Sequence, residues 1–105
     1  MSDNEFDMLW EALRNNKIKW TLHSFKRIRE RKISADAVVD AVVNGKVIEH
    51  YREDKPFPSC LIFNGNIDSP LHIVASACDD FVYIITAYVP SSDEWECDCK
   101  TRKEQ

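Results

Sequence analysis

The sequence predicts an α+β fold in which N-terminal helices pack on one face of a twisted antiparallel β-sheet. Two observations support this fold class. Up to Val43, apolar residues recur mostly at spacings of three and four, as on one face of amphipathic helices; from Lys46 onward they alternate with polar residues, as in half-buried strands. With 105 residues the chain is long enough for one modest core, so we expect a single domain over residues 1–105.

The expected domain begins with a helix over residues 1–16 and ends in a polar tail over residues 93–105. Between them, residues 17–92 hold further helices and the sheet. The N-terminal helix is indicated by apolar residues at helical spacing: Phe6, Leu9, Trp10 and Leu13. Residues 17–22 then alternate apolar and polar side chains, which fits either a short strand or an extended link.

Two more helices are expected between Ser24 and Gly45. Ser24 is an N-cap residue type, and Phe25 and Ile28 give a short helix one buried edge. Ser34 is the next candidate N-cap, and Asn44-Gly45 is a C-terminal stop. The helix between them should turn its apolar side chains inward: Ala35, Val38, Val39, Val42 and Val43.

Four strands are expected, over residues 47–51, 59–63, 71–78 and 81–89. The last two form a hairpin whose register has two alternatives. A two-residue loop places His72 and Tyr88 on opposite sides of the sheet. A three-residue loop pairs Cys78 with Val82 and places His72 directly across from Tyr88. The sequence does not choose between these registers.

Charge is unevenly distributed along the chain. The formal net charge of −4 argues against a protein that is coated in nucleic acid. However, eight Lys or Arg residues lie between Arg14 and Lys32, where Glu30 is the one acid. A smaller basic group follows in the tail, at Lys100, Arg102 and Lys103. A local cationic site on an acidic body can still hold a few phosphates.

These residues have the chemistry that metal-independent RNA cleavage needs. That reaction requires a base for the 2′-hydroxyl, an acid for the leaving oxygen and cations for the phosphorane. Histidine suits the proton transfers and arginine suits the phosphate. The candidates are His23, Arg27 and Arg31 on a short helix, His72 and Tyr88 on the sheet, and Lys100 and Arg102 in the tail. Purely structural roles remain open for both histidines.

Cysteine usage and the N-terminus indicate a cytoplasmic protein. The acidic N-terminus lacks the layout of a signal peptide, and the longest apolar-rich run is too short to span a membrane. Without a secretory context, the four cysteines are expected to be reduced thiols. Cys97 and Cys99 provide too few ligands for a metal site within one chain, so we expect no metal or cofactor. Metal binding by this pair across a dimer is a remaining alternative.

Several short motifs follow one another in a fixed order: His23-Ser24, Arg27, Glu30-Arg31-x-Ile33-Ser34, Asn44-Gly45-Lys46-Val47-Ile48-Glu49-x-Tyr51, Pro58-Ser59-Cys60-Leu61, Pro70-Leu71-His72-Ile73-Val74, Ile84-Ile85-Thr86-Ala87-Tyr88-x-Pro90 and Trp95. In this order they resemble domain-of-unknown-function family 4258, a family of small prokaryotic domains. The resemblance covers residues 20–102, which is most of the chain.

This family is similar to the RelE-like, barnase-like group of toxin ribonucleases, and its members often look like toxins of type II toxin–antitoxin pairs. The resemblance therefore implies an RNA-cleaving toxin with a helical layer on a twisted antiparallel sheet. It also implies a partner, a small zinc-finger or DNA-binding antitoxin. The family pattern contains His23, Arg27, Arg31, His72 and Tyr88, and Arg102 matches its terminal arginine.

The leading hypothesis is a metal-independent endoribonuclease acting on mRNA. One of His23 and His72 would be the base and the other the acid, while Arg27 and Arg31 would hold the scissile phosphate. Tyr88 and Arg102 would steady that phosphate. This hypothesis requires the basic helix to lie within reach of His72 and Tyr88. The alternative is a binding module that has the fold without the catalysis and contacts a protein or a nucleic acid through the basic helix.

Overall fold

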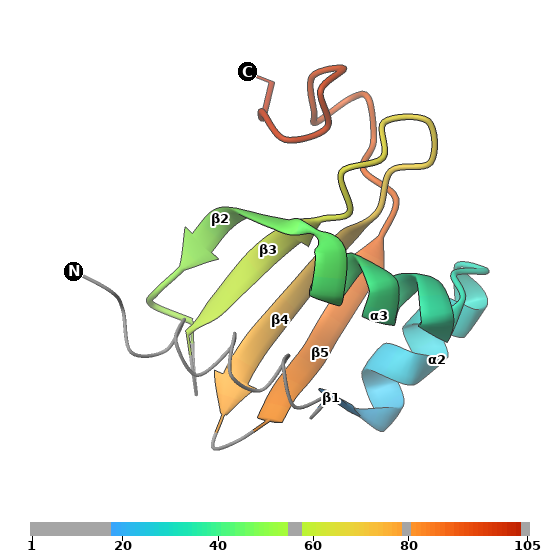
Figure 1. Cartoon of the computed structure of the whole chain (residues 1–105), viewed down its shortest axis with the longest axis vertical. Coiled ribbons are helices and arrows are strands. Elements are labelled where there is room, and N and C mark those ends of the chain that lie inside the picture. Colours follow the sequence, from blue (N-terminus) through green and yellow to red (C-terminus); the bar gives the residue numbers. More distant parts are fainter. Residues whose placement is uncertain (1–17, 55–57, 79–80, 104–105) are drawn as a thin grey trace.

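The computed structural model describes residues 18–54, 58–78 and 81–103, and the expected helix over residues 1–16 lies outside these ranges. Within these ranges two helices pack against a five-stranded mixed sheet, so the α+β class is confirmed (Figure 1). In chain order the elements are β1 (Ile18–Trp20), α2 (Leu22–Glu30), α3 (Ala35–Asn44), β2 (Lys46–Tyr51), β3 (Ser59–Phe63), β4 (His72–Cys78) and β5 (Phe81–Tyr88). No helix in these ranges is both long and apolar enough to cross a membrane.

The sheet is mixed, which corrects the expectation of a purely antiparallel sheet. Its strand order is β1-β5-β4-β3-β2, and every neighbouring pair is antiparallel except β1 with β5. The alternation of Ile18 and Trp20 indicates a strand, but a period of two contains no information about strand direction. Within the described ranges this strand also precedes both helices, so α2 and α3 do not begin the fold.

Helix α2 begins three residues earlier than the sequence indicates. Its N-cap is Thr21, whose hydroxyl accepts from the Ser24 N–H at 2.9 Å, while the Ser24 hydroxyl accepts from the Thr21 N–H at 3.0 Å. This reciprocal capping box makes Ser24 the third helical residue rather than the cap. Thr and Ser are both good caps, so residue type alone did not separate the two positions.

Helix α3 begins and ends as expected. Ser34 caps it by accepting from the Ala37 N–H at 3.0 Å, and Gly45 follows its last residue. A Cβ on Gly45 would lie 2.3 Å from the Ala41 carbonyl oxygen and 2.4 Å from that of Phe63, so only glycine fits between helix and sheet. Val38 and Val42 are buried, whereas Val43 is 44% exposed because it is one helical step away from the inward face.

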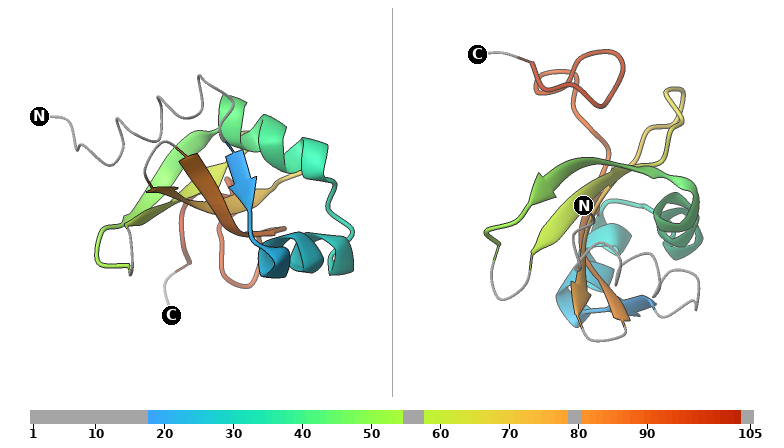
Figure 2. Two further views of the ribbon diagram at one scale, coloured as in Figure 1. Left: turned by 90° about the horizontal axis from the view of Figure 1, so that it is seen from below. Right: turned by 60° about the vertical axis from the view of Figure 1, so that its left-hand side comes forward.

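The two faces of the sheet have different coverings. Helix α3 covers one face, where Val38 and Val42 join a core with Ile73 and Ile84, and Ile28 of α2 is part of the same core. Because successive side chains of a strand point to opposite faces, His72 points away from this core. Figure 2 (left) shows α3 above the sheet and the C-terminal segment below it. The polar tail therefore lies on the face opposite α3.

Two β-bulges determine which side chains point to the face of the sheet that the tail covers. In the β4–β5 pair, Cys78 pairs with Phe81 and Ala75 with Ile84, but Val74 pairs with Thr86, so Ile85 is an extra residue. Pairing therefore begins in the register of a two-residue loop, yet His72 still lies directly across from Tyr88. Neither register alternative described this combination, because a bulge inverts the side-chain alternation beyond it.

The second bulge is in β2. Val47 pairs with Ile62, and Glu49 pairs with Leu61, so Ile48 is the extra residue. Val47 packs against the helix-side core, whereas Glu49 and Tyr51 contact the tail on the other face. Without the bulge, Val47 and Glu49 would share one face.

Candidate functional site

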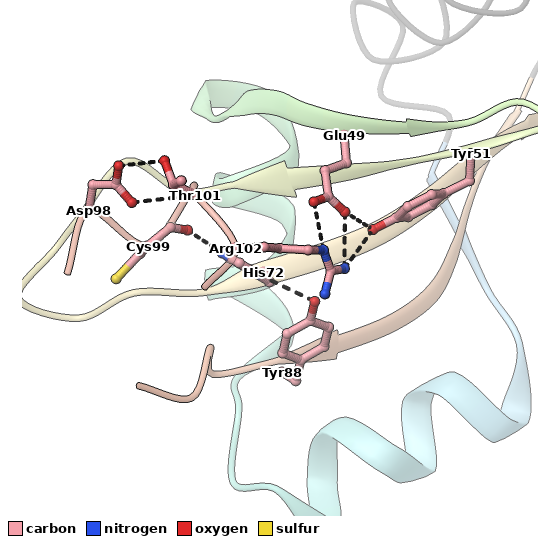
Figure 3. Close-up of polar contacts among 8 residues, drawn as sticks. All are labelled: Glu49, Tyr51, His72, Tyr88, Asp98, Cys99, Thr101 and Arg102. Atoms are coloured by element: carbon pink, nitrogen blue, oxygen red, sulfur yellow. Dashed lines mark hydrogen bonds and ion pairs between the residues drawn. The ribbon is translucent and has the colours of Figure 1, made fainter. Parts of the chain in front are cut away.

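Five side chains from three strands and the tail meet on the tail-covered face (Figure 3). Glu49 and Tyr51 come from β2, His72 from β4, Tyr88 from β5 and Arg102 from the tail. We call this set the sheet-face cluster. It joins groups that can transfer protons to a guanidinium that can bind an anion.

His72 is the centre of the cluster and is fully buried, with 0% of its surface exposed. Its Nε2 lies 2.6 Å from the Cys99 carbonyl oxygen, and its Nδ1 lies 3.3 Å from the Tyr88 hydroxyl. A carbonyl can only accept, so Nε2 carries the proton in the neutral ring and donates it to Cys99. Nδ1 then has a free lone pair and accepts from the Tyr88 O–H.

The surroundings of His72 favour this neutral ring. Burial lowers the pKa of His72, and this effect outweighs the hydrogen bond to Cys99, which acts in the opposite direction. The ring also packs edge-on against Trp95, with 4.5 Å between the ring centroids, and against Phe63. Burial likewise raises the pKa of Tyr88, so its hydroxyl stays protonated at neutral pH.

Glu49 and Arg102 form a two-pronged ion pair beside this histidine. Arg102 Nε lies 2.8 Å from Glu49 Oε2, and Nη2 lies 3.0 Å from Oε1. Tyr51 donates its hydroxyl proton to Glu49 Oε1 at 2.5 Å. Burial alone would raise the pKa of Glu49, but the bonds from Arg102 and Tyr51 leave it lowered. Burial and the bond to Glu49 raise the pKa of Tyr51 to about 12.

The tail covers the sheet-face cluster. Trp95 is only 2% exposed, and the Arg102 guanidinium stacks over its ring at 4.5 Å. Backbone bonds close this segment on itself, with the Glu96 N–H donating to the Thr101 carbonyl at 2.8 Å. Asp98 accepts from the Lys100 and Thr101 N–H groups, which lower its pKa. The Asp98 carboxylate is thus engaged within the tail.

Of the residues that the sequence indicates, the structure brings together His72, Tyr88 and Arg102. Arg31 lies nearby: its Nη1 donates to the Thr86 hydroxyl at 3.1 Å and to the Ala87 carbonyl at 2.7 Å, next to Tyr88. Lys100 is exposed in the tail.

His23 and Arg27 are exposed on α2, and neither makes a hydrogen bond or ion pair with the sheet-face cluster in the part of the chain that the structure describes. Next to them, a shallow hollow is lined by Leu22, Phe25, Lys26, Arg29 and Glu30. Leu22 is 87% exposed and Phe25 is 40% exposed. We call His23, Arg27 and this hollow the α2 basic surface.

Sequence reasoning missed Glu49, Tyr51 and the aromatic contact of Trp95. Glu49 and Tyr51 did occur in the quoted motif, but regular alternation from Val47 would have placed Glu49 in the core. Among the described residues, no group of three or more His, Cys, Asp or Glu is arranged to hold a metal ion. Cys97 is exposed, and Cys99 contributes its carbonyl oxygen to the cluster rather than its thiol.

The family model described as Domain of unknown function (DUF4258) matches residues 20–89. The chain belongs to this family. The match extends from β1 to just beyond β5, so it includes every member of the sheet-face cluster except Arg102. Neither the search of curated proteins nor the search of solved structures finds a match.

Proposed function

We propose that this DUF4258 protein is a metal-independent endoribonuclease whose reacting groups are in the sheet-face cluster. The observation that carries this proposal is the contact of His72 Nδ1 with the Tyr88 hydroxyl, beside a guanidinium that Glu49 holds in place. One proton-transfer pair and one phosphate-binding group then lie on one face. The RelE-like, barnase-like architecture belongs to this proposal as well.

In this mechanism Tyr88 contacts the RNA and His72 acts through it, because His72 has no exposed surface. Tyr88 takes the 2′-hydroxyl proton while it passes its own proton to His72 Nδ1. The 2′-oxygen bonds to phosphorus, and the bond to the 5′-oxygen breaks. The same pair then returns one proton to the leaving oxygen, so the products are a 2′,3′-cyclic phosphate and a 5′-hydroxyl.

Arg102 supplies the positive charge for the phosphorane. Glu49 occupies Nε and Nη2 of Arg102. Because the Arg102 side chain is half exposed, its Nη1 is the atom that can bind a phosphate oxygen. Stacking on Trp95 and the two hydrogen bonds that Arg102 donates to Glu49 fix the plane of the guanidinium before RNA arrives. Preorganised charge of this kind is a large contribution to catalysis.

The test is incubation of the purified protein with RNA in EDTA. We expect 2′,3′-cyclic phosphate ends from the wild type and a rate about 100-fold lower from Tyr88→Phe. Tyr83→Phe is the matched control, because it removes a hydroxyl from the same strand outside the cluster, and it should cut within about twofold of the wild type. Intact RNA with the wild type, or rapid cleavage by Tyr88→Phe, would refute the proposal.

A second candidate function is a binding module of the toxin–antitoxin kind without catalysis. It is favoured by the α2 basic surface, where exposed Leu22 and Phe25 lie beside Lys26 and Arg29. Charge complementarity there suits an acidic protein segment that carries apolar side chains, as an antitoxin would supply.

Titration with an acidic amphipathic peptide tests this second function. Binding that Lys26→Glu weakens, in a protein that leaves RNA intact, would support the binding module. The binding module would be rejected if the peptide does not bind, or if a version of the peptide with Gln in place of Glu binds equally well. Tight binding of RNA rather than the peptide at this surface would also reject the proposed protein partner.

A further inference from the structure

We propose that Arg31 is a positioning residue: it holds the bulge of β5 and thereby keeps Tyr88 opposite His72. The catalytic importance of this role rests on the proposed function, but the geometric role does not. Arg31 is the C-cap residue of α2, 55 residues away from Thr86 in sequence. It links the end of a helix to the strand that carries a reacting group.

The contacts of Arg31 fall on the residues that follow the bulge. Its Nη1 donates to the Thr86 hydroxyl at 3.1 Å and to the Ala87 carbonyl at 2.7 Å. Ile85, immediately before them, is the extra residue of the strand, and Tyr88 is the residue immediately after them. One guanidinium nitrogen thus fixes the two positions between the bulge and the reacting hydroxyl.

The sheet leaves room for this role because β1 is short. β1 pairs with β5 only at Val82, Tyr83 and Ile84, and the chain then enters α2 at Leu22. Beyond Ile84, β5 has no strand neighbour on that side within the described ranges. The Ala87 carbonyl would lack a partner there, and the Arg31 side chain supplies the donor that a longer β1 would have supplied.

The bulge needs such support because the face to which Tyr88 points depends on it. If Ile85 were taken into regular pairing, every later side chain of β5 would move to the opposite face. Tyr88 would then turn toward the helix-side core, away from His72 and Arg102. Holding Thr86 and Ala87 in place opposes this slip. Arg31 therefore acts on the reaction through Tyr88, and it does not need to touch the phosphate.

The experiment measures the ¹⁵N chemical shift of His72 Nδ1 by NMR in the full chain. Tyr88→Phe gives the reference value for a nitrogen that has lost its hydrogen bond. Arg31→Met should move the Nδ1 shift toward this reference, and Arg31→Lys should move it part of the way. Lys46→Met, which removes a charge from β2, should leave it unchanged. A wild-type Nδ1 shift in folded Arg31→Met would overturn the proposal.

Two further measurements keep the proposal testable. If Arg31→Met does not fold, Thr86→Val removes one of the two acceptors with little change in shape, and its Nδ1 shift should move in the same direction; an unchanged value overturns the role. With RNA, Arg31→Lys should lower kcat and leave KM unchanged, because the substrate is not contacted; a raised KM with normal kcat would instead indicate a phosphate contact. Failure of the wild type to cut RNA refutes the proposed function, whereas the Nδ1 result stands independently.

Discussion

The sheet-face cluster and the α2 basic surface contain similar residue types in opposite environments. In the cluster, His72 is buried and both of its ring nitrogens have partners, and Arg102 has a carboxylate and an aromatic ring. On α2, His23, Lys26 and Arg27 are exposed. The first environment fixes geometry and shifts pKa values, and the second presents charge to whatever approaches. Acid–base chemistry needs the first, while the second is suited to binding.

The two regions also differ in how they are assembled. The α2 basic surface comes from one helix, so its charges are neighbours in the sequence. The cluster joins Arg102 to Glu49 across 53 positions and His72 to Cys99 across 27. Charge density along a sequence therefore identifies the surface readily and says little about the cluster.

Loss of Trp95 should give the largest difference between the two regions in the free energy of unfolding. Trp95→Ala removes a buried ring from between His72 and Arg102, and should cost about 3 kcal/mol in the free energy of unfolding. Leu22→Ala, on exposed α2, should change it by less than about 0.5 kcal/mol. Urea denaturation followed by circular dichroism measures both values. Equal costs would mean that the tail is not anchored as described.

Replacing one arginine in each region should give a smaller difference in the free energy of unfolding. Arg102→Met loses the ion pair and the stacking on Trp95, and because the side chain is half exposed we expect a loss of about 1 kcal/mol. Arg29→Met should be close to neutral in the same urea titration. A neutral Arg102→Met would show that the pair with Glu49 does not hold the tail.

Acidification should destabilise the protein through His72. Its pKa is lowered in the folded state, so the unfolded chain binds the proton more readily, and stability falls as the pH drops below about 6.5. Thermal unfolding between about pH 7.5 and 5 should show this fall in the wild type and a smaller one in His72→Asn. If the stability of His72→Asn falls with pH as steeply as that of the wild type, His72 is not a buried neutral ring.

Charge reversal on α2 should have the least effect on the reaction itself. If the α2 basic surface only attracts RNA and takes no part in the reaction, Lys26→Glu should raise KM for RNA and leave kcat within about twofold. Steady-state cleavage at two salt concentrations checks this, since the KM difference should shrink as salt screens the charges. A large loss of kcat would place chemistry on α2.

Much of the fold could be predicted from periodicity, and the errors have specific causes. The four antiparallel strands β2 to β5 and helix α3 follow from local pattern. The direction of β1 and the choice between Thr21 and Ser24 as cap do not, since direction is set by tertiary packing and both residues are good caps. For the site, His72, Tyr88 and Arg102 could be named from residue chemistry. Glu49 could not, because the extra residue Ile48 inverts the alternation that would assign its face.

The most direct test of the central claim is single-turnover RNA cleavage in EDTA at saturating protein, which removes differences in binding. If the reacting groups lie in the sheet-face cluster, Tyr88→Phe should be about 100-fold slower than the wild type, and Lys26→Glu should equal the wild type. Cleavage that is lost in Lys26→Glu and retained in Tyr88→Phe would contradict the claim and place the reaction on α2.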